Sequence, residues 1–256
     1  MEESIWKIDG NQTTLRLQGF AAGLDLSRFD LGFTNLEIDG SSASGKILGV
    51  TVDSGVPGRT VDDRRNDAPM EAYVRGSQLV ATYAATVDRP VGFQIEWEAQ
   101  SSESGLVILD VMISVQTPLL ETYPEVTVTS DLRCRELSFN ANGSTTDGLA
   151  LQDKELQSED SGISLASLSE DDSEGGLFYS EMVHPTDFLS WQGLPQADGV
   201  TTTWKLCDHF MEKGVIRRLR ARGILVLDRT CSREFALELA RKEFRRLEAE
   251  QPPLTA

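Results

Sequence analysis

The chain contains two histidines, and each lies close to acidic residues in a pattern that suits proton transfer. Asp187 follows His184 by three positions, and Glu212 follows His209 at the same spacing. A histidine ring titrates near neutral pH, so a histidine–carboxylate pair can act as a general acid or base. We therefore take all four as candidate catalytic residues. The alternative is that each histidine makes a local hydrogen bond and that the acids are solvated.

Three arginines at alternate positions form a second feature that could do chemistry. The segment Val215–Leu227 alternates as a single strand does, so Arg218, Arg220 and Arg222 share one face. At a rise of about 3.3 Å per residue they stand about 6.6 Å apart. We call them the arginine row and predict that they bind substrate.

Charged side chains on earlier strands predict a polar sheet face that binds sugar. Arg75, Glu96 and Glu98 fall on such strands, and Trp191 offers an aromatic plate. Sugar sites combine hydrogen-bonding groups with an apolar surface for the sugar ring. The spacing of Glu96 and Glu98 also permits paired-carboxylate glycoside chemistry. The alternative is a solvated face of cross-strand ion pairs. Further members of this predicted group are Tyr73, Gln94, Asp110, Gln116 and Trp204.

Short segments with strand periodicity, separated by turn residues, run through most of the chain and must position these groups. We expect strands at Ser4–Ile8, Thr13–Leu17, Phe20–Leu24, Phe33–Ile38, Lys46–Val52, Glu71–Arg75, Gln78–Val87, Val91–Ala99, Leu106–Thr117, Val126–Ser130, Arg135–Phe139, Leu177–Val183, Thr201–Leu206 and Val215–Leu227. Gln192–Gly199 is rich in turn residues, and we expect a turn there.

The clearest alternation lies in Val91–Ala99 and Leu106–Thr117, and it predicts antiparallel strands with one buried and one polar face. The sequence therefore predicts an all-β protein, a large antiparallel β-sandwich in one domain, residues 1–256. In its length and its many long antiparallel strands, the chain is similar to the galactose-mutarotase-like super-sandwich. That resemblance rests on the strand pattern and not on signature residues, and it implies a fold rather than a function.

Three segments depart from the strand pattern. Residues 232–249 carry an apolar stripe at helical spacing, with Thr230 or Ser232 as N-cap, and predict one C-terminal amphipathic helix. Residues 152–175 are acidic and rich in Ser and Gly, which predicts a flexible insertion with a short strand at Gly162–Leu165. Residues 53–69 show no periodic pattern of apolar residues, which predicts a long loop that is either mobile or part of a functional site.

The charge distribution bears on partners. The formal net charge is −17, which disfavours nucleic acid because phosphate binding needs clustered Lys and Arg. The C-terminal part, residues 213–256, is basic and is expected to dock on the acidic body. The first hypothesis is a carbohydrate-interacting protein, either a binding module or a mutarotase- or lyase-like enzyme. As an alternative, we consider a non-enzymatic scaffold that meets a protein partner through residues 152–175 and the C-terminal helix. We expect no membrane partner, since no apolar run is long enough to span a bilayer.

Several motifs are missing from the sequence. It has no P-loop, no GxGxxG and no GxSxG, so we expect no cofactor and no nucleotide chemistry. Three cysteines without CxxC spacing predict free thiols, and the acidic N-terminus lacks a signal-peptide core, which together predict a cytoplasmic protein. We assign no metal ligands. A metal-dependent hydrolase using the two histidines and a carboxylate remains a third alternative.

Overall fold

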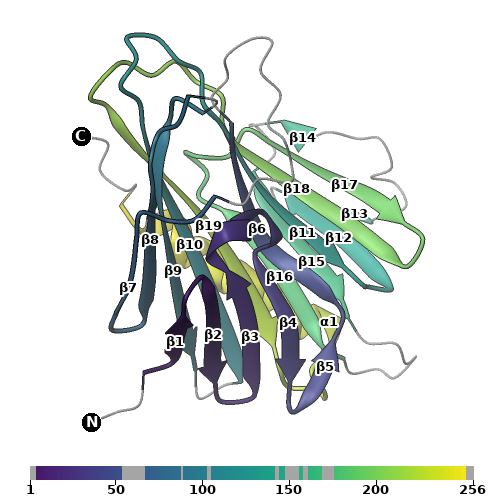
Figure 1. Cartoon of the computed structure of the whole chain (residues 1–256). Coiled ribbons are helices and arrows are strands. Elements are labelled where there is room, and N and C mark those ends of the chain that lie inside the picture. Colours follow the sequence, from purple (N-terminus) through teal and green to yellow (C-terminus); the bar gives the residue numbers. More distant parts are fainter. Residues whose placement is uncertain are drawn as a thin grey trace.

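Antiparallel strands in two large sheets that pack face to face make up most of the described chain, with one α-helix (Figure 1). The protein is represented by a computed structural model, which describes residues 4–53, 67–87, 89–102, 105–141, 144–147, 156–157, 161–168 and 176–251. The predicted all-β sandwich is confirmed. No helix among these residues is long and apolar enough to cross a membrane.

Ten strands form the first sheet. In spatial order they are β1 (Trp6–Asp9), β2 (Gln12–Leu17), β3 (Phe20–Asp25), β4 (Phe33–Ile38), β6 (Gly45–Asp53), β11 (Glu125–Leu132), β18 (Gly199–Cys207), β17 (Ser190–Gln196) and β14 (Leu156–Gln157), with β5 (Ser41–Ala43) paired to β4. A short 3-10 helix, Leu26–Leu31, joins β3 to β4. This sheet forms one wall of the core.

Nine strands form the second sheet, which carries most of the predicted site residues. In spatial order they are β13 (Ser144–Asp147), β12 (Glu136–Ala141), β15 (Gly162–Ser167), β16 (Phe178–Val183), β19 (Ile216–Val226), β10 (Leu106–Gln116), β9 (Gly92–Ser101), β8 (Gln78–Tyr83) and β7 (Glu71–Arg75). The alternation predicted for β9 and β10 is confirmed along most of their length. Their inward side chains, including Phe93, Ile95 and Trp97, are almost completely buried.

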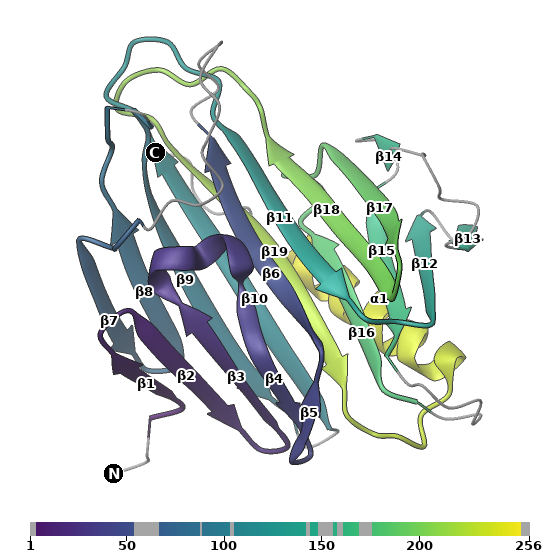
Figure 2. The same ribbon diagram turned by 45° about the vertical axis from the view of Figure 1, so that its right-hand side comes forward.

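The outer face of the nine-stranded sheet is divided into two parts. Helix α1 (Arg233–Ala249) packs over β15 and β16, and Figure 2 shows it behind these strands. The covered part is apolar: Met182 and Ile224 belong to one buried cluster with Ala240 and Leu247 of the helix. The part formed by β10, β9, β8 and β7 lies beyond the helix and carries the polar side chains. The end of α1 therefore marks the border between an apolar and a polar surface.

The helix begins where the sequence predicts, and its cap can be tested. The side chain of Ser232 accepts a hydrogen bond from the backbone N–H of Phe235 at 3.3 Å, whereas Thr230 donates to Asp228 outside the helix. An N-cap of this kind contributes about 1 kcal/mol. We expect Ser232→Ala to lower the free energy of unfolding by about this amount in urea denaturation. Thr230→Ala, the matched control, should change it less; the reverse order would contradict this cap.

One carboxylate lies deep between the two sheets. Glu181 of β16 is 1% exposed and accepts hydrogen bonds from four side chains. Tyr179 and Trp204 donate at 2.9 Å each, Thr202 at 2.9 Å, and Ser130 also donates. Burial raises the pKa of Glu181 above its usual range, although these donors act in the opposite direction. The cluster links β16 to strands of the opposite sheet.

A β-bulge supplies one of these donors. The register of β11 against β6 shifts between Thr129 and Asp131, so Ser130 has no direct partner residue on β6. Its hydroxyl accepts instead from the backbone N–H of Leu48 at 2.8 Å, and Leu48 has a positive φ of 56°. Bulges redirect side chains in this way. Here the bulge places the Ser130 hydroxyl between the sheets.

Some predictions differ from the structure or fall outside the part it describes. The turn expected at Gln192–Gly199 is wrong for most of its length, because β17 continues to Gln196 and pairs with β18. The short strand predicted at Gly162–Leu165 is present as β15. Most of the loop at 53–69, and residues 152–155, 158–160 and 169–175 of the acidic segment, lie outside the described residues. The single-domain assignment stays a prediction.

Candidate functional site

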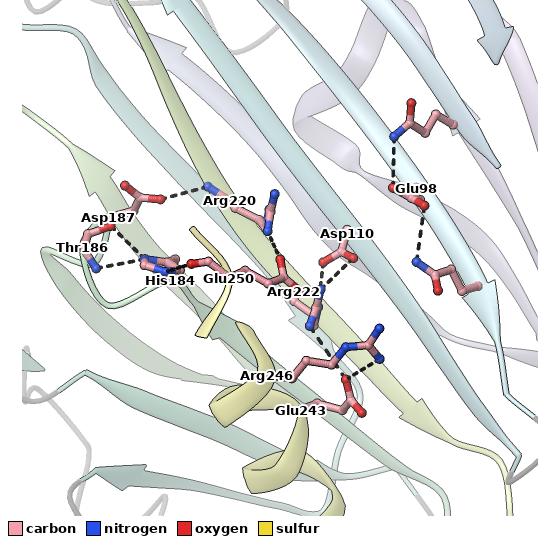
Figure 3. Close-up of polar contacts among 12 residues, drawn as sticks. Glu98, Asp110, His184, Thr186, Asp187, Arg220, Arg222, Glu243, Arg246 and Glu250 are labelled. Carbon is pink, nitrogen blue, oxygen red and sulfur yellow. Dashed lines mark hydrogen bonds and ion pairs between the residues drawn. The ribbon is translucent and has the colours of Figure 1, made fainter. Parts of the chain in front are cut away.

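A cleft of about 180 Å³ opens on the polar part of the outer face, beside the C-terminal end of α1. Four strands and the helix end contribute to it, as Figure 3 shows for its central residues. The lining residues are Gln78 from β8; Glu96, Glu98 and Gln100 from β9; Ile108, Asp110 and Met112 from β10; Arg220 and Arg222 from β19; and Arg246 and Glu250 from the end of the helix. Most of them are charged or carry amides.

The strand register brings these side chains together. Asp110 on β10 is directly opposite Arg222 on β19 and Glu98 on β9. Two residues further along β10, on the same face, Met112 is directly opposite Arg220 on β19 and Glu96 on β9. Directly opposed residues point to one face with Cβ atoms about 5 Å apart. The predicted polar face and the alignment of the arginine row are therefore confirmed as geometry.

Arg222 is the centre of the ion pairs in the cleft. Its Nε and Nη2 atoms donate to the two oxygens of Asp110 at 2.7 and 3.0 Å. Nη2 also donates to Glu250 at 3.1 Å, and Nη1 lies 3.8 Å from the Glu243 carboxylate. The Arg222 side chain is only 6% exposed, so these contacts are shielded from water. Arg220 adds a second ion pair to Glu250.

Burial changes the electrostatics of this pair. It raises the pKa of Asp110 above its usual range, while the hydrogen bonds and charge of Arg222 act to lower it. The paired carboxylates raise the pKa of Arg222 against the effect of its own burial. Three carboxylates thus meet one guanidinium; Glu250 and Glu243 have second cations in Arg220 and Arg246, whereas Asp110 is held by Arg222.

The opposite side of the cleft is organised around Glu98. This carboxylate accepts hydrogen bonds from Ser77 at 3.1 Å, Gln78 at 3.1 Å and Gln100 at 3.3 Å. Its neighbour Glu96 lies 3.6 Å from Arg75, whose side chain is largely exposed at the rim. Glu98 is thus held by a hydroxyl and two amides, and Glu96 by an exposed arginine, rather than by buried cations. This side is therefore rich in acceptors.

His184 and Asp187 lie behind the cleft rather than in it. The His184 Nδ1 atom accepts from the backbone N–H of Thr186 at 3.3 Å, and Nε2 is 3.3 Å from the carbonyl oxygen of Glu250. These partners require the proton on Nε2 in the neutral ring. Asp187 accepts from the backbone N–H of Arg220 at 3.3 Å, and burial raises its pKa. The pair anchors the segments that carry Glu250 and Arg220 (Figure 3).

The second histidine pair lies in the connection between β18 and β19. His209 is half exposed, with Nδ1 3.2 Å from Asp208, and Glu212 is exposed in the same connection. No contact within the described part of the chain joins His209 to His184, and neither lines the cleft. A catalytic role for either pair stays a prediction.

The remaining predicted ligands divide between the cleft and the core. Arg220, Glu96 and Glu98 line the cleft, whereas Arg218 is exposed outside its lining. Trp191 is completely buried, and its ring lies 4.7 Å from that of Phe139. This placement corrects the expectation of an aromatic plate, because a buried ring offers no surface to a ligand.

Sequence analysis missed the contribution of the helix. Glu243 and Arg246 are three positions apart on one face of α1, and Glu250 follows as its C-cap residue. The spacing can be recognised in the sequence, but it does not predict that the helix packs on the outer face of the sheet beside the cleft. Gln78 and Gln100 were missed because amides on a strand face are common.

The described residues provide no site that would support the two alternative functions, a metal-dependent hydrolase and a protein-interaction scaffold. Among the residues with described positions, no group of three or more His, Cys, Asp or Glu side chains could hold a metal ion. The protein partner predicted for residues 152–175 concerns a segment that lies mostly outside those positions, and it stays a prediction.

Comparisons with known proteins bear on the fold. No family model matches the chain. No curated protein matches it in sequence. Among solved structures, it is similar to a candidate aldose 1-epimerase from Klebsiella pneumoniae, with a TM-score of 0.51, 8% identity, and coverage of 95% of this chain and 86% of that one.

Two further structures have lower scores. A galactose 1-epimerase from Lactobacillus acidophilus has a TM-score of 0.47 and 11% identity, and the alignment covers 84% of this chain and 93% of that one. An α-galactosidase from Geobacillus stearothermophilus has a TM-score of 0.48 and 7% identity, and the alignment covers 86% of this chain and 40% of that one. At an identity of 8%, the similarity to the Klebsiella structure shows the fold alone.

Proposed function

We propose that the chain binds a carbohydrate in the cleft between Arg222 and Glu98. The observation that supports this most is the arrangement of acceptors and donors on one sheet face. Glu96 and Glu98 offer acceptors, Gln78 and Gln100 offer amides, and Arg220 lies on the far side. A sugar hydroxyl both donates and accepts, so it needs such a mixture.

The cleft also has an apolar component. Ile108 and Met112 of β10 lie in its lining between the polar groups. They replace the missing aromatic plate as a surface for the C–H groups of a sugar ring. The volume of about 180 Å³ is below the roughly 300–1,000 Å³ of drug-sized ligand pockets. The ligand is therefore a single sugar ring or the end of a longer glycan.

Binding is tested by titration of free aldohexoses, followed by NMR shifts of the protein. We expect Glu98→Ala to weaken binding about tenfold, since a hydrogen bond to a charged group contributes about 1.5–3 kcal/mol. Glu71→Ala is the matched control, because Glu71 is an exposed carboxylate on the edge strand β7 of the same sheet and does not line the cleft. Equal affinity in both variants, or no shift with any sugar, would contradict the proposal.

The enzymatic form of this proposal is an aldose epimerase, the activity named for the Klebsiella structure. Interconversion of the anomers needs a base that takes the proton from the O1 hydroxyl and an acid that protonates the ring oxygen as the C1–O5 bond breaks; reclosure from the other face of the carbonyl returns both protons. Asp110, whose pKa is raised by burial, is the candidate acid, and Glu98, its neighbour on the adjacent strand of the cleft floor, is the candidate base. The test is the rate of anomer exchange of glucose and galactose, followed by NMR. Asp110→Asn should abolish any acceleration, and His184→Gln and His209→Gln test the histidine hypothesis separately.

A further inference from the structure

A second and larger cavity lies between the two sheets, away from the polar cleft. It has a volume of about 530 Å³ and opens where the β4–β5 hairpin faces the beginning of β16. This volume falls within the range of about 300–1,000 Å³ that is usual for small-molecule sites. The cavity is independent of the proposed sugar site, because the two share no lining residue.

The inner part of this cavity is apolar. Ile38, Ile47, Leu132 and Leu225 line it, and each is at most 5% exposed on the protein surface. Tyr179 also lines it, and its hydroxyl is fixed by the hydrogen bond to Glu181 in the core. The ring passes over Gly223, where a Cβ atom would approach the Tyr179 hydroxyl to 2.7 Å. The wall is therefore rigid and built from both sheets.

The mouth of the cavity is polar and carries two exposed arginines. Arg133 has no ion pair among the described residues, and Arg229 lies only 4.0 Å from Asp39 and is 59% exposed. The acidic group at this mouth, Asp131, is already paired with Lys46 at 3.1 Å. Among the described lining residues, two arginines outnumber the one aspartate, so this part of the mouth is locally positive on a chain whose net charge is −17.

We propose that this cavity binds a medium-chain carboxylate, a single alkyl chain with an anionic head. The alkyl chain enters between the sheets and contacts the apolar wall. The carboxylate stays at the mouth, where Arg133 and Arg229 pair with it. A neutral sugar would leave the apolar wall unused, and a cationic amphiphile would meet two guanidinium groups.

The experiment is a calorimetric titration with hexanoate, octanoate and decanoate, each below its micelle concentration. We expect the Kd to fall about fourfold for each added methylene group, as burial of alkyl surface requires. The double variant Arg133→Gln with Arg229→Gln should bind octanoate about tenfold more weakly. Arg245→Gln, an exposed arginine on α1, should bind it as the wild type does.

A blocking variant separates the cavity from adsorption elsewhere. Ser42 lines the mouth and is exposed, so Ser42→Trp narrows the entrance without disturbing the core. We expect it to abolish octanoate binding with an unchanged circular dichroism spectrum. Three results would overturn the proposal: no chain-length dependence, equal affinity for octanol and octanoate, or a wild-type dimer that Ser42→Trp converts to monomer, since a second copy would then be the occupant.

Discussion

Replacement of Glu181 by alanine is expected to lower the free energy of unfolding by about 3 kcal/mol or more. The carboxylate is the shared acceptor for Ser130, Tyr179, Thr202 and Trp204 in the interior of the sandwich. Its removal leaves these donors without an acceptor, at about 1–3 kcal/mol for each group that finds no new partner. Relief of the buried charge offsets part of this loss. Urea denaturation at neutral pH measures the difference.

Glu181→Gln is the matched control. The amide oxygen still accepts from Trp204 and Thr202, and the amide N–H groups can donate to the hydroxyl oxygens of Ser130 and Tyr179. We expect a loss of about 1 kcal/mol. Equal losses for alanine and glutamine would show that the hydrogen bonds of this cluster do not stabilise the fold.

The wild type and Glu181→Gln should also differ in how their free energy of unfolding depends on pH. Burial raises the pKa of Glu181 above 4.5 in the folded state, so the folded protein holds a proton that the unfolded chain releases. The stabilisation from this proton is complete below the unfolded pKa and is lost as pH rises through the folded pKa. Wild type should therefore lose stability relative to Glu181→Gln as pH rises through that window. A constant difference would contradict the raised pKa.

Local periodicity was sufficient to predict the elements that hold the cleft. Phe93, Ile95 and Trp97 alternate with polar residues, so burial of one side fixes which residues point outward. The same reasoning placed Arg220 and Arg222 on one face. It could not pair Arg222 with Asp110, 112 positions earlier, because the order of strands in a sheet is not a local property.

The failures have the same physical origin. Trp191 lies in a stretch where no strand was expected, and only its packing against Phe139 of the second sheet shows that its side chain points inward. Glu181 gave a usable signal, because in β16 it shares a face with Tyr179 and Val183 and not with Met182. A carboxylate on the apolar side of a strand indicates a buried polar cluster. Its four donors come from three strands, and no sequence pattern joins them.

Replacement of Arg222 by methionine should have a comparably large effect on the cleft. The guanidinium is the shared partner of Asp110, Glu243 and Glu250, and it is 6% exposed. Without it, the buried carboxylate of Asp110 loses its cation, whereas Glu250 and Glu243 keep Arg220 and Arg246 as partners. The loss of one partner from a buried ion pair costs about 3–5 kcal/mol. We expect a loss of this size in urea denaturation at pH 7.

Arg220→Met is the matched control, because Arg220 has one ion-pair partner, Glu250, and is more exposed. It should cost about 1 kcal/mol or less. The double variant Arg222→Met with Asp110→Leu should recover much of the lost stability, since an apolar pair of similar volume often replaces a buried ion pair without net loss. Equal losses for Arg222→Met and Arg220→Met would contradict the central role of Arg222. Sugar affinity should fall in both Arg222→Met and Arg220→Met. The free energy of unfolding, and not the affinity, therefore distinguishes the two variants.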